Sequence, residues 1–215
     1  MKTKVKQKRL KQSSRNWVSR QINDPYVSLA KKEGYRSRSA YKLIEIQEKF
    51  KIIKKDSIII DLGAAPGGWS QVASQISSNI IAVDLLDIAP IQNVEFIKGD
   101  FLEPNIQEQL SLRKADLIMS DMSPNTCGIK KVDHLRIINL VENVFAFARQ
   151  NLKNEGTIIA KVFQGGTENF LLSCLKQEFK KITHMKPKAS RKESSEIYII
   201  AQSFKPKTLL CYTQP

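Results

Sequence analysis

The residues from Ile58 to Trp69 give the strongest indication of chemistry in this chain. Three isoleucines run into Asp61, a turn rich in glycine and alanine follows, and Trp69 opens a helical pattern. A strand, a tight turn and a helix N-terminus form the nucleotide pocket of α/β folds, because Gly63 and Gly67 let backbone approach a ligand that faces the first helical N–H groups. The glycine spacing does not match Gly-x-Gly-x-x-Gly, and no Lys-Ser/Thr pair follows as it does in a phosphate-binding loop. An adenosine group without phosphate therefore fits best. For this turn alone, a tight connection without a ligand is an equal alternative.

Aspartates end four successive predicted strands. Asp84 lies 23 positions after Asp61, where α/β nucleotide folds place a carboxylate that accepts hydrogen bonds from two ribose hydroxyls. Asp100 and Asp121 end the next two strands in the same way. Aspartate is common at turns, so any one of them could be structural. Ligands bind at the carboxyl ends of strands in an open parallel sheet, so the four together predict a ligand site.

Two charged residues lie in or beside apolar strands. Lys161 is inside the apolar run 157–163, and Glu196 directly precedes the run 197–201. A lysine in such a strand must reach the surface, pair with a carboxylate, or lose its proton because desolvation disfavours its charge. A position at the solvent end of the strand is the ordinary explanation, and the sequence leaves these alternatives open.

Two N-terminal helices are predicted ahead of the strands. Asp24-Pro25 is a good helix start and Gly34 a good stop. A second helix over 39–50 has an apolar face. Lys42 lies on the opposite face of that helix, so periodicity by itself predicts an ordinary surface lysine.

From residue 57 onward, strands and helices alternate, which predicts an α/β fold with a parallel sheet. The last two segments, 181–186 and 196–203, both read as strands with no helix between them. They indicate a terminal hairpin with one antiparallel strand in an otherwise parallel sheet. The other strands are predicted near 58–62, 80–84, 94–98, 115–120 and 156–163, and the helices near 69–76, 105–112, 133–151 and 167–179.

The net charge of +14 is concentrated near the N-terminus. Residues 1–55 hold 17 basic and 4 acidic side chains, whereas the remaining 160 residues hold 18 and 17. Residues 1–20 alone contain eight basic side chains and no acidic one. A nearly neutral α/β domain with a basic N-terminal segment is typical of nucleic-acid binding. A solvated tail and an organelle transit peptide are the alternatives.

Length and composition predict one domain with a full core, since the chain has 215 residues and 41% hydrophobic content. It has no apolar run long enough for a membrane helix or a secretory signal. Cys127, Cys174 and Cys211 are too widely spaced for a disulfide framework or a metal cluster, which favours reduced thiols in the cytosol. His134 and His184 stand alone, and we assign neither a role.

Several longer motifs occur in an order that resembles one family. Over roughly residues 15–203 the chain resembles the FtsJ/RlmE family of S-adenosylmethionine-dependent RNA 2′-O-methyltransferases. The turn at 77–79 is shorter than usual, Ser123 replaces a common alanine, and 204–215 extends past the usual end. The motifs are Asp61-Leu-Gly-Ala-Ala-Pro-Gly-Gly-Trp-Ser-Gln, Ser120-Asp121-Met-Ser-Pro-Asn125, Lys161-Val-Phe-Gln-Gly165, Arg36-Ser-Arg-Ser-Ala-Tyr-Lys42-Leu and Arg191-Lys-Glu-Ser-Ser-Glu196-Ile-Tyr.

The resemblance implies a Rossmann-like methyltransferase fold, with a mostly parallel seven-stranded sheet and one antiparallel strand near the C-terminus. It implies S-adenosylmethionine as the cofactor and no metal. The family's Lys-Asp-Lys-Glu tetrad corresponds to Lys42, Asp121, Lys161 and Glu196. The cofactor contacts correspond to Gly67, Trp69, Asp84, Asp100 and Asp121.

The implied function is 2′-O-methylation of a uridine in the A-loop of 23S rRNA, in support of ribosome assembly. Such an enzyme must align a ribose hydroxyl with the activated methyl group and remove its proton. A neutral Lys161 is the expected base, helped by burial and by the charge of Lys42, while Asp121 and Glu196 orient the lysines. The sequence leaves open which lysine is neutral.

The expected partner is large-subunit rRNA within the assembled 50S subunit or a late precursor, and we expect a monomeric cytoplasmic enzyme without a membrane or metal partner. The same chemistry on tRNA or mitochondrial rRNA is the nearest alternative, and a non-catalytic RNA-binding assembly factor is a further one. The expected organisation is a disordered basic tail over 1–14, a basic helical segment over 15–55 packed on the core, the methyltransferase domain over 56–203 and a C-terminal tail over 204–215.

Overall fold

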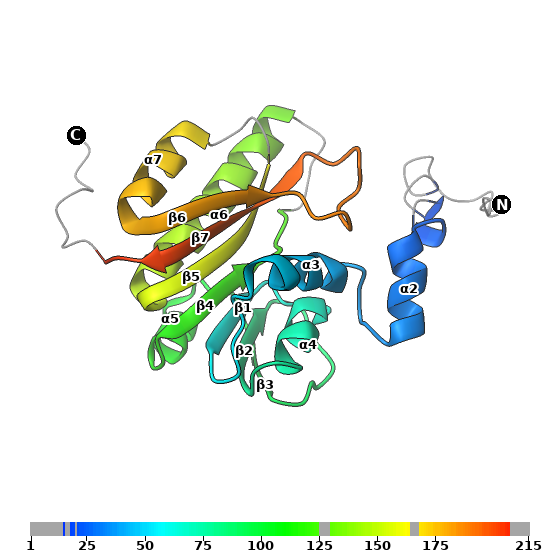
Figure 1. Ribbon diagram of the computed structural model, residues 1–215, viewed down its shortest axis with the longest axis horizontal. Helices are drawn as coiled ribbons and strands as arrows, with labels where there is room; N and C mark the ends of the chain where they lie inside the picture. Colours follow the sequence, from blue (N-terminus) through cyan, green and yellow to red (C-terminus); the bar gives the residue numbers. More distant parts are fainter. Residues whose placement is uncertain (1–14, 16–17, 20, 125–129, 164–167, 207–215) are drawn as a thin grey trace.

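The computed structural model describes residues 15, 18–19, 21–124, 130–163 and 168–206. In this part of the chain, a seven-stranded sheet lies between two layers of helices (Figure 1). None of the helices searched within these ranges has the length and apolarity needed to cross a membrane. The tail predicted over 1–14 and most of the one predicted over 204–215 lie outside the described residues.

The sheet has the predicted mixed topology. Strands β1 to β5 run parallel, whereas β7 pairs antiparallel with both β5 and β6. This confirms the predicted fold class, including the antiparallel strand near the C-terminus. The order across the sheet is β3 (Val94–Lys98), β2 (Asn79–Asp84), β1 (Ile58–Leu62), β4 (Ala115–Ser120), β5 (Leu152–Phe163), β7 (Glu196–Phe204) and β6 (Phe179–Met185).

Helices cover both faces of the sheet because successive residues of each strand point to opposite sides. In β1, Ile59 packs with α3 (Ala40–Phe50) and α4 (Gly68–Ser74), whereas Ile60 packs in the core on the opposite face. That second core is covered by α5 (Pro104–Ser111), α6 (Lys130–Asn151) and α7 (Glu168–Glu178). With both faces buried, the ends of the strands are left for a ligand.

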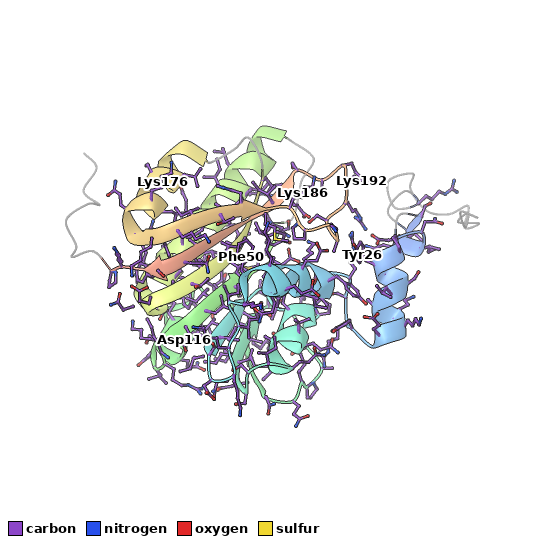
Figure 2. The ribbon with its side chains drawn as sticks, viewed as in Figure 1. Tyr26, Phe50, Asp116, Lys176, Lys186 and Lys192 are labelled. Carbon is purple, nitrogen blue, oxygen red and sulfur yellow. The ribbon has the colours of Figure 1, made fainter. Side chains whose placement is uncertain are left out.

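Helix α2 (Pro25–Glu33) lies at one side of this body (Figure 1). Asp24 caps it by accepting a hydrogen bond from the backbone N–H of Tyr26 at 3.0 Å, and Gly34 ends it with a φ of 78°. Both boundaries agree with the sequence prediction. The Tyr26 end of α2 lies beside the β6–β7 connection (Figure 2), where Ala189 is buried against Ala30.

Candidate active site

The four predicted aspartates lie at the carboxyl ends of parallel strands. Asp61 and Asp84 belong to β1 and β2, Asp121 directly follows β4, and Asp100 lies two residues after the end of β3. The strand order reverses between β1 and β4, which is where ligands bind in open α/β sheets. The topology thus brings together four carboxylates that are far apart in the sequence.

Four charged side chains form one cluster at this edge: Lys42, Asp121, Lys161 and Glu196. The Asp121 Oδ1 atom lies 3.3 Å from Lys42 Nζ and 3.2 Å from Lys161 Nζ. The two Glu196 oxygens each lie 3.6 Å from one of the same nitrogens. Each carboxylate therefore bridges both lysines, so two positive and two negative charges meet.

Pairing explains how two lysines are buried here. Lys42 and Lys161 are each only 7% exposed, and a buried charge requires partners. Burial by itself would raise the pKa of Asp121, but the charges of Lys161 and Lys42, together with hydrogen bonds from Tyr198 and Lys161, hold that pKa below its ordinary value. Of the alternatives that the sequence left open for Lys161, the structure has it paired with carboxylates.

Periodicity was a poor guide to Lys42, and the prediction of an ordinary surface lysine is wrong. Helix α3 is in contact with protein on its polar side as well as its apolar side. Glu45 accepts hydrogen bonds from the backbone N–H groups of Lys188 and Ala189, at 2.6 and 2.8 Å. A helix packed on two sides buries polar residues that a single amphipathic face would leave in solvent.

Sequence reasoning missed Tyr198 as a member of this cluster. Its hydroxyl accepts a hydrogen bond from Lys42 Nζ at 2.8 Å and donates one to Asp121 Oδ1 at 2.5 Å. A signal was available, because Tyr198 is two positions after Glu196 in a strand and must point to the same side. The register also pairs it directly with Lys161.

Asp84 is held in place at the end of β2. Its Oδ2 atom accepts a hydrogen bond from the N–H of Ala65, and its Oδ1 atom accepts one from the N–H of Leu86, both at 2.8 Å. Each carboxylate oxygen has a further lone pair, so both can still accept from ribose hydroxyls. Asp100 is fixed in a similar way by the N–H of Leu102 at 3.0 Å.

The turn after β1 favours glycine at position 67, because its backbone is left-handed there. Gly67 has a φ of 98°, and a Cβ there would lie 2.9 Å from Ile91 Cδ1 and 3.0 Å from Arg36 Nη1. Helix α4 begins directly after it, so unpaired N–H groups face this edge. The Asp84 carboxylate lies at the same edge, and this is where the sequence predicts the adenosine part of S-adenosylmethionine.

Trp69 is a core residue. Its indole is 3% exposed, donates a hydrogen bond to the carbonyl of Ser39 at 2.9 Å, and packs on the Tyr198 ring at a centroid distance of 5.6 Å. The side chain thus fastens α4 to the start of α3. Its contact with the cofactor stays a prediction.

Arg36 is a second residue whose position only the structure reveals. Its guanidinium donates to the carbonyls of Ala89 and Pro90, at 2.6 and 2.8 Å. Its backbone N–H donates to Gln71 Oε1 at 3.0 Å. Arg36 therefore joins the loop after β2 to α4, on either side of the predicted adenosine site.

Asp61 lies beneath this edge and is only 1% exposed. Burial above all, together with the charges of Asp121 and Asp84, raises its pKa to about 7 despite a hydrogen bond from Ser70 Oγ at 2.6 Å. The carboxyl group is therefore poised to change its charge near neutral pH.

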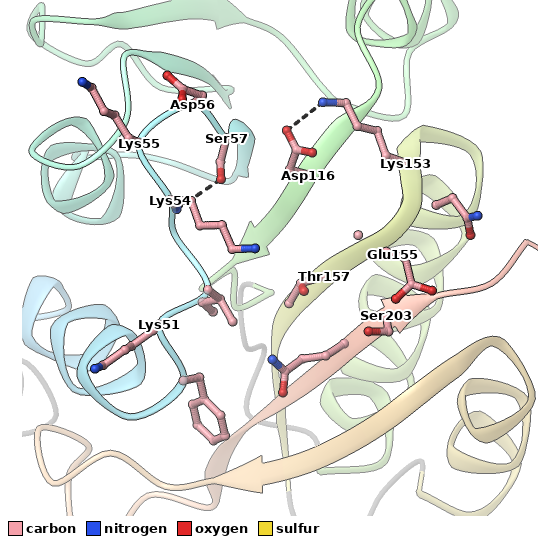
Figure 3. A pocket seen from close by; sticks show the side chains of 15 residues that line it. Lys51, Lys54, Lys55, Asp56, Ser57, Asp116, Lys153, Glu155, Thr157 and Ser203 are labelled. Carbon is pink, nitrogen blue, oxygen red and sulfur yellow. Dashed lines mark hydrogen bonds and ion pairs between the residues drawn. The ribbon is translucent and has the colours of Figure 1, made fainter.

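A pocket of about 780 Å³ lies at the opposite end of the sheet, near the starts of β1, β4 and β5 (Figure 3). Lys51, Lys54 and Thr157 are among its lining residues. Its Asp116 carboxylate is paired with Lys153 at 2.8 Å. None of the tetrad residues lines it, so it is separate from the predicted reaction site.

Comparison with known proteins agrees with this geometry. Residues 35–204 match the model of the family of FtsJ-like methyltransferases. Ribosomal RNA large subunit methyltransferase E of Rickettsia akari is 53% identical over 200 residues, which cover 88% of each chain.

Solved structures show the same fold. A Plasmodium falciparum protein assigned as a ribosomal RNA methyltransferase is 34% identical, with a TM-score of 0.71 over 80% of this chain and 100% of that one. A Streptococcus mutans protein assigned as a methyltransferase, solved in complex with SAH, is 14% identical, with a TM-score of 0.50 over 75% of this chain and 97% of that one. The second likeness is one of fold alone.

Proposed function

Because the chain belongs to the family of FtsJ-like methyltransferases, we propose that it methylates the 2′-hydroxyl of a uridine in the A-loop of 23S rRNA and so supports ribosome assembly. It is an S-adenosylmethionine-dependent methyltransferase. The buried cluster of Lys42, Asp121, Lys161 and Glu196 is the observation that carries the proposal. A ribose hydroxyl needs a base at neutral pH, and this cluster holds two candidate amines beside the predicted cofactor site.

Lys161 is the proposed base. When bound, S-adenosylmethionine supplies a methyl group activated by a positively charged sulfur. Lys161 Nζ would take the proton as the O–H bond of the ribose breaks and the oxygen bonds to the methyl carbon. The carbon–sulfur bond would break at the same time, and its electron pair would go to the sulfur of the departing thioether. The resulting ammonium is stabilised by the carbonyl of Asp121, 2.6 Å away, and by the carboxylates of Asp121 and Glu196.

Lys42 has a different proposed role. It is the proposed cation of the pair, and it donates hydrogen bonds to the Asp121 carboxylate and the Tyr198 hydroxyl. Its positive charge favours the neutral form of Lys161 before the transfer. Asp121 orients both amines.

The cofactor would be held at the edge formed by β1, β2 and the residues after β3. Asp84 would accept hydrogen bonds from the two ribose hydroxyls. The other proposed contacts are Gly67, Trp69, Asp100 and Asp121.

The proposed substrate is large-subunit rRNA within the 50S subunit or a late precursor, bound in the cytoplasm by a monomeric enzyme that needs no metal. The excess of basic residues over 1–55 supports an RNA partner. Within that segment, Lys31 and Lys32 are exposed on α2.

The test is methylation in vitro of ribosomal subunits, free rRNA and tRNA with labelled cofactor, followed by mapping of the modified ribose. Label at one uridine of the A-loop is the expected result. Label on tRNA alone would refute the ribosomal substrate, and label on a base rather than a ribose would refute the role of Lys161. The Lys161→Ala variant is the control for contaminating activity.

A further inference from the structure

We propose that Tyr198 is a positioning residue of this active site, whose hydroxyl fixes Lys42 and Asp121 relative to Lys161. The inference rests on the proposed function for its kinetic consequences, but the geometry that carries it is independent of the substrate. Tyr198 is 0% exposed, so it acts through its neighbours and does not touch the substrate.

The hydrogen-bond directions around the hydroxyl are determined by its partners. A phenol has one proton to donate, and the carboxylate of Asp121 can only accept. Lys42 Nζ lies 2.8 Å from the same oxygen and can only donate as an ammonium. The chain of bonds therefore runs from Lys42 through Tyr198 to Asp121 Oδ1.

The hydrogen bond from Tyr198 to Asp121 lies among several charged groups, so it affects their electrostatics. Lys42 faces it from α3, Lys161 from β5, Asp121 from the end of β4 and Glu196 from its own strand, and Arg38 adds a more distant positive charge. The remaining neighbours are apolar: Trp69 on α4 packs against the ring, and Met185 is its partner on β6.

Burial and the nearby carboxylates raise the pKa of Tyr198 well above its ordinary value, so the phenol stays protonated and keeps donating. That donation takes up part of the negative charge of Asp121. Without it, the carboxylate would hold the protons of the two lysines more strongly. Tyr198 thus makes it easier for the base to be neutral.

The Tyr198→Phe variant removes the hydroxyl and keeps the ring that packs on Trp69. We expect a single-turnover methylation rate about three- to ten-fold lower near neutral pH. The rising limb of the pH–rate profile should move to higher pH by about half to one unit. Affinity for S-adenosylmethionine, measured by calorimetry, should stay the same.

Tyr41→Phe is the matched control. It removes another buried tyrosyl hydroxyl, which donates to Glu33 Oε2 at 2.8 Å. Both variants should show similar melting temperatures, but only Tyr198→Phe should shift the pH–rate profile. An unshifted profile for Tyr198→Phe, or a uniform loss of rate that follows a lower melting temperature, would overturn the proposal.

A second readout needs no RNA. The ammonium groups of Lys42 and Lys161 can be titrated by NMR in labelled wild-type and Tyr198→Phe proteins. A midpoint that moves to higher pH in the variant supports the proposal, and unchanged midpoints refute it. If the wild type methylates no RNA, the proposed function fails while the inference about Tyr198 is still decided by this titration.

Discussion

At the scale of single residues, the two lysines of the cluster are held differently. Lys161 donates to the main-chain carbonyl of Asp121 at 2.6 Å, whereas Lys42 donates to the hydroxyl of Tyr198. A carbonyl can hold a neutral amine as well as an ammonium, because either has N–H groups to donate. The same is true of the Tyr198 hydroxyl, and both amines lie 3.2–3.3 Å from Asp121 Oδ1, so the choice of Lys161 as the base depends on its variants.

Lys161 gives the sharpest prediction. Lys161→Ala should abolish methyl transfer and leave folding and cofactor binding largely intact, since alanine buries no charge. Lys161→Arg should be nearly as inactive, because a guanidinium stays protonated and cannot accept the hydroxyl proton. Single-turnover methylation and thermal melting of both variants check this. Near-normal turnover by Lys161→Arg would rule out Lys161 as the base.

Asp61 predicts a pH dependence of stability. Its pKa rises from 3.8 to about 7 on folding, so between these values the folded protein keeps a proton that the unfolded chain has lost. The free energy of unfolding therefore falls as pH rises through this window, and the loss is complete above pH 7. The Asp61→Asn variant has no carboxyl group at this position, so it lacks this contribution to the pH dependence.

Asp61→Asn should therefore gain stability relative to wild type as pH rises from about 4 to about 7, by up to a few kcal/mol. Urea unfolding at a series of pH values measures this difference. Asp56→Asn changes an exposed carboxylate at the other end of the sheet and is the control. Parallel curves for wild type and Asp61→Asn would contradict the prediction.

At the scale of elements, the segment that joins α2 to α3 and the start of α3 contact both the predicted cofactor site and the tetrad. Arg36 joins the loop after β2 to α4, and Lys42, six residues later in the first turn of α3, reaches the tetrad. Glu45 then ties α3 to the β6–β7 connection. The basic segment that is predicted to bind RNA is thus directly connected to the predicted cofactor loops.

Arg36→Ala should weaken S-adenosylmethionine binding by about three- to thirty-fold, because the loop after β2 loses its hydrogen bonds to the guanidinium. Calorimetry measures the affinity. Arg113→Ala removes a guanidinium of an exposed ion pair with Glu95 and should leave the affinity unchanged. Equal affinities for the two variants would show that Arg36 has no part in shaping the pocket.

At the scale of the whole molecule, positive charge is distributed unevenly along the chain, and Lys42 of the tetrad belongs to its basic segment. The excess of positive charge lies within residues 1–55, while the rest of the chain is close to neutral. A basic region beside a neutral catalytic domain can hold a polyanion without binding it to the cofactor pocket. Affinity for RNA and affinity for the cofactor should therefore respond to different changes.

Deletion of residues 1–20 removes eight basic side chains. It should weaken RNA binding and make the binding less dependent on salt, because fewer counterions are released. Cofactor affinity should barely change. Filter binding at several salt concentrations, with calorimetry for the cofactor, tests both points. Full activity with the same salt dependence would mean that these residues only solubilise or address the protein.

Local patterns in the sequence were enough to predict the helices and strands, and also the edge of the sheet at which the site lies. Apolar runs determine where strands form, and the Asp24-Pro25 start and the Gly34 stop of α2 depend on neighbours in the chain. The aspartates at the ends of parallel strands followed from the same reasoning, since parallel strands place their carboxyl ends together.

The tertiary structure decided which charged side chains are buried together. Lys42 is 79 positions from Asp121, and Tyr198 is 77 positions from it. No local periodicity encodes such distances, so a helix face that looked solvent-exposed turned out to face the site. The resemblance to a family identified the four tetrad residues, but only packing revealed Tyr198 and Arg36, because their roles depend on atoms contributed by distant segments.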